Sequence, residues 1–109
     1  MEASPERIEI YVTSDGKIPF LEWLSSLKDV KGRAMIRVRI DRVSVGNFGD
    51  CRAIGSGVYE LRIDYGPGYR VYFGQTGSDI VLLLCAGDKT TQKADIKRAL
   101  AYWEDHRRE

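Results

Sequence analysis

The chain has 109 residues, of which 30% are charged, and a formal net charge of +1. This length suits one domain that buries a core without disulfide or metal staples, and the near-zero charge provides no global field to draw the protein onto nucleic acid. The longest apolar run, Ile80–Ala86, is far shorter than the roughly 20 residues needed to cross a bilayer. The composition therefore predicts a single soluble domain, residues 1–109, with no membrane partner.

The two cysteines and the N-terminus predict a cytoplasmic location. Cys51 and Cys85 lack a C-x-x-C spacing, which is typical of a reducing compartment. Cys85 lies inside the apolar run, where a small core residue is expected rather than a nucleophile. The first ten residues, MEASPERIEI, are acidic and contain no apolar segment of a signal peptide.

The first half of the chain predicts one strand and two helices. Arg7–Thr13 alternates isoleucine and valine with polar residues and predicts the strand. Ile18–Leu27 opens with a proline in its first turn and repeats apolar residues at helical spacing. Gly32–Val45 predicts the second helix through one apolar stripe, but its β-branched content leaves a strand over Met35–Ile40 as an alternative.

The second half predicts a sheet followed by a helix. A short edge strand is expected near Cys51–Ile54, a buried strand at Ile80–Ala86 and a final helix at Gln92–His106. The order of strand, two helices, antiparallel strands and helix predicts an α+β fold in which an antiparallel sheet is flanked by two N-terminal helices and a C-terminal helix.

The most informative stretch is a β-hairpin between the edge strand and the buried strand. Its strands, Tyr59–Tyr65 and Tyr69–Phe73, are joined by the turn Gly66-Pro67-Gly68. The predicted pairs are Tyr65 with Tyr69, Ile63 with Val71, Leu61 with Phe73 and, on the other face, Arg62 with Tyr72 and Asp64 with Arg70. That second face carries two arginines and a tyrosine, and we expect it to hold a phosphodiester.

Several segments taken in order resemble the RelE/ParE superfamily of bacterial toxin–antitoxin modules. The likeness is to the branch of HigB-like and Gp49-like addiction-module killer proteins. It is carried by PFLEWL at 19–24, VYELR at 58–62, GPGYRVYF at 66–73, LLCAGDK at 83–89, QKADI at 92–96 and AYW at 101–103. The resemblance implies a compact sheet flanked by helices and ribosome-dependent mRNA cleavage. It also implies partnership with a cognate helix-turn-helix antitoxin in an oligomeric complex.

RNA cleavage without a metal needs a charge stabiliser for the phosphate, and arginine suits that role because its planar fork donates two hydrogen bonds to phosphate oxygens. By resemblance, Arg70 matches the arginine of the family segment associated with phosphate stabilisation. An ion pair between Arg70 and Asp64 is the alternative. Arg62 and Lys89 align with further basic positions, and a solvated strand residue is an equal alternative for Arg62.

Further RNA contacts are predicted for Arg37 in the second helix and for Lys93 near the start of the last helix, where a solvated face is the competing interpretation. Tyr72 is a candidate acid or base-stacking platform, with cross-strand packing as its alternative.

The general base and acid are the least well matched positions. Relatives place a lysine where this chain has Glu60 and a tyrosine near Asp95. Glu60 is a candidate base or a charge balancer for Arg62. Asp95 is a candidate acid or base on the last helix, or a first-turn residue favoured by the helix dipole.

Other chemistries lack the residues they require. His106 is the single histidine, so a zinc site or a histidine triad is not expected. Gly55-Ser56-Gly57 is followed by no lysine and no helix, which argues against a nucleotide loop, and no cofactor is predicted. Two alternatives to a ribonuclease stay open: a ParE-like toxin that binds a topoisomerase, and a catalytically degenerate partner that acts by binding its antitoxin.

Overall fold

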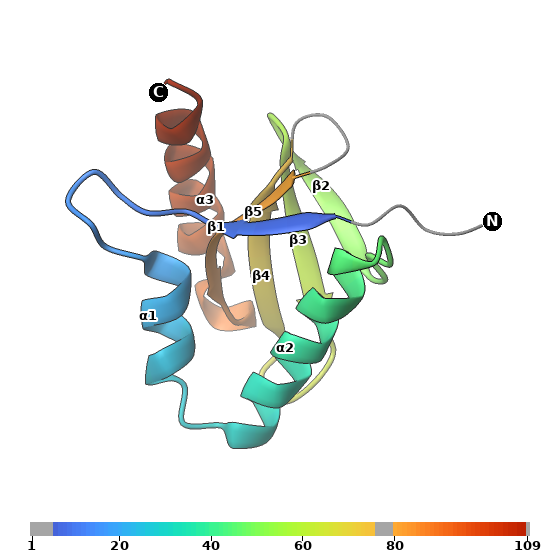
Figure 1. Cartoon of the computed structure of the whole chain (residues 1–109). Helices are drawn as coiled ribbons and strands as arrows, with labels where there is room; N and C mark the ends of the chain where they lie inside the picture. The colour runs from blue at the N-terminus through green and yellow to red at the C-terminus, as the bar shows by residue number, and fades with distance from the viewer. Residues whose placement is uncertain (1–5, 76–79, 109) are drawn as a thin grey trace.

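The computed structural model describes residues 6–75 and 80–108, which form five strands and three α-helices (Figure 1). In chain order these are β1 (Arg7–Ile10), α1 (Pro19–Ser26), α2 (Val30–Ser44), β2 (Cys51–Gly55), β3 (Val58–Ile63), β4 (Tyr69–Gly74), β5 (Ile80–Gly87), the short 3₁₀ segment η1 (Lys89–Thr91) and α3 (Gln92–Arg107). The predicted α+β fold and its order of elements are confirmed. Residues 1–5, which carry most of the argument against a signal peptide, lie outside the described residues.

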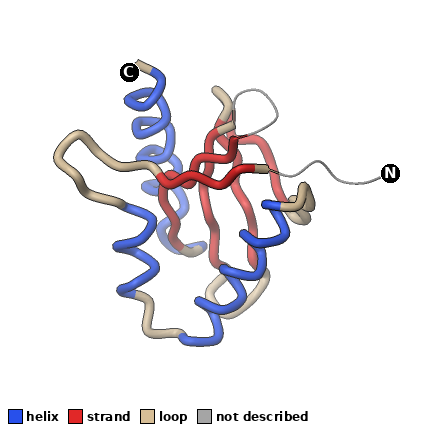
Figure 2. Tube along the Cα trace, in the orientation of Figure 1, coloured by secondary structure: helices blue, strands red, loops and turns tan. Residues whose placement is uncertain are grey.

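The strands lie together in one sheet (Figure 2). Their order across it is β1-β5-β4-β3-β2. Neighbours from β5 to β2 pair antiparallel, but β1 runs parallel to β5, with Arg7 opposite Ile80 and Ile10 opposite Leu83. The sheet is therefore mixed, and the prediction of a wholly antiparallel sheet was wrong in this one pairing. Parallel strands need a long crossover, which the chain between β1 and β5 supplies.

Helices cover both faces of the sheet. α1 and α2 pack on one face over a core that includes Phe20, Ile36 and Val71, and α3 packs on the other over a core that includes Leu84 and Trp103. β5 lies between the two cores, and its residues from Val81 to Gly87 are all buried. This double burial explains why its sequence is a continuous apolar run rather than an alternating one.

The helices begin where their sequences favour it. Pro19 occupies the first turn of α1, where its missing N–H costs nothing. The Asp29 side chain accepts a hydrogen bond from the Gly32 N–H at 2.9 Å, so α2 starts at Val30, two residues before the predicted start. Tyr69 donates its hydroxyl to the same carboxylate at 2.6 Å. Asp29 thus joins the start of α2 to the hairpin.

A glycine on β4 allows α3 to approach the sheet closely. A Cβ placed on Gly74 would lie 2.1 Å from Cε3 of Trp103, so no larger residue fits beneath the indole ring. The indole N–H donates to the Ser56 carbonyl at 2.8 Å, in the turn between β2 and β3. Trp103 therefore anchors α3 both by packing and by a hydrogen bond.

The hairpin pairs in a different register from the one predicted. Ile63 lies opposite Tyr69, Leu61 opposite Val71 and Tyr59 opposite Phe73, a shift of two residues. The shift arises because the connection spans Asp64 to Gly68, with both of its glycines at positive φ, and is longer than a tight turn. A shift of two keeps every side chain on its predicted face but changes its partner.

Candidate basic groove

The register of the hairpin brings two predicted residues together. Arg62 on β3 lies directly opposite Arg70 on β4, on the sheet face that α3 covers in part. The predicted neighbours of these arginines, Tyr72 for Arg62 and Asp64 for Arg70, are both wrong. Like charges on opposite strands repel, so this pair requires a counter-charge.

A groove of about 350 Å³ lies beside this pair. Its walls include Arg62 and Arg70 from the sheet and the exposed Lys89 from η1. It is also bordered by Asp50, Ile63, Asp64 and the turn from Gly66 to Gly68. The structure thus brings together the three basic residues of the predicted catalytic set.

A larger hollow of about 530 Å³ lies along α3, between Ser56 and Arg108. None of the predicted catalytic residues lines it. Its charged members are Glu104, Arg107 and Arg108, and Glu104 forms an ion pair with Arg108 at 2.8 Å. We therefore place the candidate site in the smaller basic groove.

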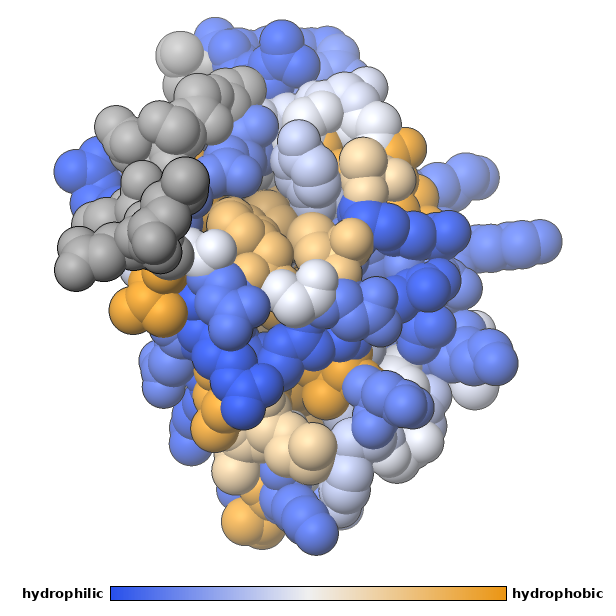
Figure 3. Space-filling view, turned by 90° about the vertical axis from the view of Figure 1, so that its right-hand side faces the viewer, coloured by the Kyte–Doolittle hydropathy of each residue, from blue (hydrophilic) through white to orange (hydrophobic). Residues whose placement is uncertain are grey.

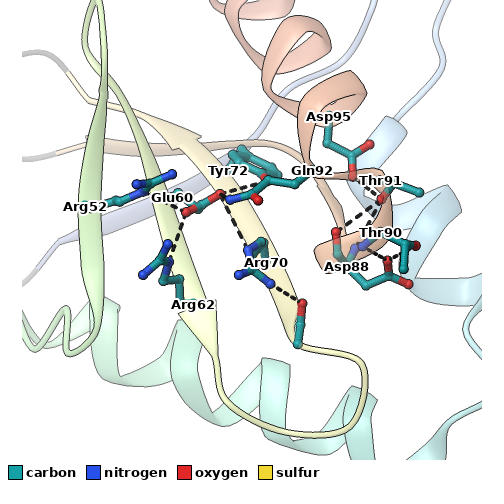
Figure 4. Close-up of polar contacts among 11 residues, drawn as sticks. Arg52, Glu60, Arg62, Arg70, Tyr72, Asp88, Thr90, Thr91, Gln92 and Asp95 are labelled. Atoms are coloured by element: carbon teal, nitrogen blue, oxygen red, sulfur yellow. Dashed lines mark hydrogen bonds and ion pairs between the residues drawn. The ribbon is translucent and has the colours of Figure 1, made fainter.

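Glu60 is the counter-charge at the centre of the site, as Figure 4 shows. Its side chain is fully buried, and each of its two carboxylate oxygens accepts two hydrogen bonds. Oε1 accepts from Nε of Arg52 at 3.0 Å and from Nε of Arg62 at 3.1 Å. Oε2 accepts from the Tyr72 hydroxyl at 3.0 Å and from the Gln92 side-chain amide at 2.9 Å.

These contacts hold the carboxylate in its charged form. Burial alone would raise the pKa of Glu60, but the hydrogen bonds from Gln92, Tyr72 and Arg62 and the charge of Arg52 outweigh it, so the pKa lies below its ordinary value. Of the two interpretations of Glu60, the charge balancer is the one these contacts favour, because no exposed oxygen remains for a substrate hydroxyl.

Arg70 is fixed between Glu60 and the turn. Its Nε lies 3.7 Å from Glu60 Oε2, and one terminal amino group donates to the Gly68 carbonyl at 2.6 Å. Nε itself is buried and has no hydrogen-bond partner among the described residues. The side chain is only 11% exposed, so Arg70 is held at the wall of the groove rather than on an open strand.

Tyr72 cannot stack on a nucleobase in this structure, which corrects that part of its prediction. Its exposure is 0%, and a stacking platform needs an open ring face. The pKa of the phenol lies well above its ordinary value, mainly because the group is buried and also because it donates a hydrogen bond to Glu60. The hydroxyl therefore stays protonated and remains a donor. Tyr72 therefore packs beneath the site and orients Glu60.

Asp95 lies apart from the groove lining. Its carboxylate is fully buried and accepts hydrogen bonds from the Thr91 hydroxyl and from Arg98. It packs so closely on Gly87 that a Cβ there would lie 1.8 Å from Oδ2. These contacts favour the structural role for Asp95 in the first turn of α3.

The two remaining candidates are not part of the groove wall. Arg37 is exposed on α2 and borders a separate hollow with Leu21 and Arg33, on the opposite side of the sheet. Lys93 is exposed in the first turn of α3.

Figure 3 looks at the molecule from the side where α2 and β2 lie in Figure 1, and it shows apolar areas separated by hydrophilic side chains.

Sequence reasoning missed two residues of the site, Arg52 and Gln92. Arg52 lies opposite Glu60 on the edge strand β2, a pairing that only the register between β2 and β3 shows. Gln92 reaches Glu60 from the start of α3 across 32 residues of sequence. The alternation of β3 places Glu60 and Arg62 on one face, and that was the one signal available for the cluster.

The part of the chain that the structure describes contains no group of three or more histidine, cysteine, aspartate or glutamate side chains that could hold a metal. No helix in residues 6–75 and 80–108 is long and apolar enough to cross a membrane.

Comparison with known proteins gives two matches. Residues 22–101 match the family described as phage derived protein Gp49-like. An uncharacterized protein of Haemophilus influenzae (strain ATCC 51907 / DSM 11121 / KW20 / Rd) is 50% identical over 82 residues, which cover 75% of this chain and 83% of that protein. Membership in the matched family implies an antitoxin partner. Because the match spans most of the chain, the protein belongs to the Gp49-like family, within the RelE/ParE-like group of addiction-module killer toxins.

Proposed function

We propose that this toxin is a metal-independent, ribosome-dependent mRNA endoribonuclease that acts in the cytoplasm and is neutralised by a helix-turn-helix antitoxin. The observation that supports it best is the convergence of Arg62, Arg70 and Lys89 on one groove. Three cations from three different elements at one hollow match the charge of a phosphodiester whose negative charge grows during cleavage.

The reaction is an internal transfer. The 2′-oxygen attacks the adjacent phosphorus, the bond from phosphorus to the 5′-oxygen breaks, and the products are a 2′,3′-cyclic phosphate and a 5′-hydroxyl. One proton leaves the 2′-hydroxyl and one proton reaches the 5′-oxygen, so the protein supplies a base, an acid and a stabiliser of the pentavalent phosphorane.

Arg70 is the stabiliser. Its contacts with Glu60 and the Gly68 carbonyl fix the guanidinium before substrate arrives, so little reorganisation is needed in the transition state. Arg62 lies opposite Arg70 and lines the same groove.

Asp64 takes the role of base in place of Glu60. It is exposed and borders the groove, and it forms no ion pair among the described residues. Its position after β3 puts it between Arg62 and the turn. Lys89 reaches the groove from a different element and protonates the leaving oxygen.

The first test is Arg70→Lys, which keeps the charge but removes the planar fork. We expect induced wild-type protein to arrest growth, coexpression of its antitoxin to restore growth, and extracts to show mRNA cut at ribosome-occupied codons. The variant loses about 10²–10³ in cleavage rate. Arg42→Ala, an exposed arginine on α2, is the control and keeps full activity.

Three outcomes would contradict the proposal. A folded Arg70→Lys protein with full cleavage activity removes Arg70 from the site. Inhibited DNA supercoiling with intact transcripts selects the ParE-like alternative, whereas unimpaired growth at verified soluble expression selects the degenerate partner.

Asp64→Asn tests the base separately. It loses about 10²–10⁴ in rate, the usual contribution of a general base, and leaves growth of the host nearly unaffected. Asp50→Asn, on the other wall of the groove, is the matched control. Equal activity of the two variants would exclude Asp64 as the proton acceptor.

A further inference from the structure

Two arginines share one oxygen of the buried carboxylate. Arg52 from β2 and Arg62 from β3 both donate Nε–H to Oε1 of Glu60, so the two guanidinium groups lie side by side (Figure 4). The terminal amino groups of both guanidinium groups make no hydrogen bond to any of the described residues. The side chains are 51% and 37% exposed, so these groups are open to solvent.

The cluster carries more positive charge than it neutralises. Three arginines, at positions 52, 62 and 70, lie within 4 Å of Glu60, and no second carboxylate forms an ion pair with any of them in residues 6–75 and 80–108. One negative charge therefore faces three positive ones. An anion that accepts from the free amino groups would relieve this excess.

We infer that Arg52 and Arg62 form a phosphate-binding subsite for single-stranded RNA, next to the phosphate that is cleaved. This inference rests on the proposed function, because it takes Arg70 as the residue at the cleaved bond. The outward amino groups of each guanidinium form a fork that matches two phosphate oxygens, and Glu60 holds both forks in place through Nε.

The subsite sets the path of the RNA across the strands. Arg70, Arg62 and Arg52 stand on the adjacent strands β4, β3 and β2. Neighbouring strands are about 4.8 Å apart, so the backbone of Arg52 is roughly 10 Å across the sheet from that of Arg70, and Arg52 is assigned to a different phosphate. Such contacts fix the register of the chain without reading its bases, so the subsite is expected to act on all RNA sequences alike.

The test is binding of a fluorescein-labelled, single-stranded 2′-O-methyl RNA octamer, which lacks the nucleophile and cannot be cut. Fluorescence anisotropy over a salt series gives the slope of log affinity against log salt concentration. Arg52→Ala is expected to lower that slope by about 0.7, the value for one lost phosphate contact on a single strand. Arg52→Lys keeps the slope, Arg42→Ala is the control, and circular dichroism verifies that each variant is folded.

Each outcome separates this subsite from the nuclease. An unchanged slope in folded Arg52→Ala, or wild-type protein that does not bind the octamer at 50 mM salt, overturns the subsite. Wild-type protein that binds with the expected slope but cuts no mRNA supports the subsite and refutes the nuclease. If wild type cleaves mRNA and Arg52→Ala cleaves it with the same rate and the same salt dependence, the subsite alone is refuted.

Discussion

Glu60→Gln tests the arginine cluster most directly. The glutamine keeps the shape of the side chain but removes its charge, and one of its two oxygens becomes an NH₂ group. The less costly orientation keeps the oxygen on Arg52 and Arg62, because the Gln92 amide can turn its own oxygen toward the new NH₂. The Tyr72 hydroxyl then loses its acceptor in a fully buried place.

The expected cost follows from these two losses. A buried hydroxyl without an acceptor costs about 1–3 kcal/mol. Loss of the counter-charge adds about 1 kcal/mol, less than the 3–5 kcal/mol of a fully buried pair, because Arg52 and Arg62 remain partly solvated. We expect the free energy of unfolding to fall by about 3 kcal/mol, a large part of the roughly 5–15 kcal/mol that a domain of this kind has.

Urea denaturation at several pH values measures the effect. The pKa of Glu60 is depressed in the folded protein, so its stabilising effect is present above its ordinary value of 4.5 and is lost as the pH falls through the lower folded value. The difference between wild type and Glu60→Gln is therefore largest near neutral pH and shrinks below about pH 4.5. Glu104→Gln, at an exposed ion pair, is the control and changes stability by only about 0.5 kcal/mol.

A Glu60→Gln protein that matches wild type within about 0.5 kcal/mol at pH 7 would refute this reasoning. If that stable variant also lost RNA cleavage, Glu60 would be a base after all. If Glu60 is a charge balancer, the pattern is the opposite. The free energy of unfolding falls, and cleavage activity falls only to the extent that the substitution displaces the arginines.

Three further changes test the fold around the site. Gly74→Ala forces a methyl group against the Trp103 ring and should cost about 1–3 kcal/mol, with a changed tryptophan emission spectrum; equal stability would show that α3 can shift freely. Ile63→Ala should cost roughly 2–5 kcal/mol in urea denaturation through a cavity in the core below α1 and α2, and a loss under 1 kcal/mol would place the side chain outside that core. Tyr69 has its pKa raised to about 12 by burial and by Asp29, so it stabilises the fold below pH 10 and loses this effect as the pH rises through 12. Absorbance titration should therefore show a tyrosine that ionises near pH 12 and is lost in Tyr69→Phe, whereas the buried Tyr72 ionises at still higher pH. A titration that Tyr69→Phe leaves unchanged would contradict the assignment.

The sequence by itself determined the secondary structure, the fold class and the face of each hairpin residue. These properties depend on local periodicity, and Leu61, Val71 and Arg62 kept their predicted sides even though the register was shifted. The same logic identified the two arginines of the groove, Arg62 and Arg70, because β-strand alternation and the turn between the strands depend on neighbouring positions. Lys89 was predicted from the family resemblance instead.

Only the tertiary structure decided how those residues interact. The parallel pairing of β1 with β5, the partner of Glu60 on β2 and the contact from Gln92 all join segments far apart in sequence, and no local pattern encodes which of them meet. Glu60 was a candidate base because the resembling family places a lysine at its position, and its neighbour Arg62 on the same face made a charge balancer the alternative. The fold buries it under α3 and surrounds it with four donors, and burial with full hydrogen bonding is what turns a candidate base into a fixed counter-charge.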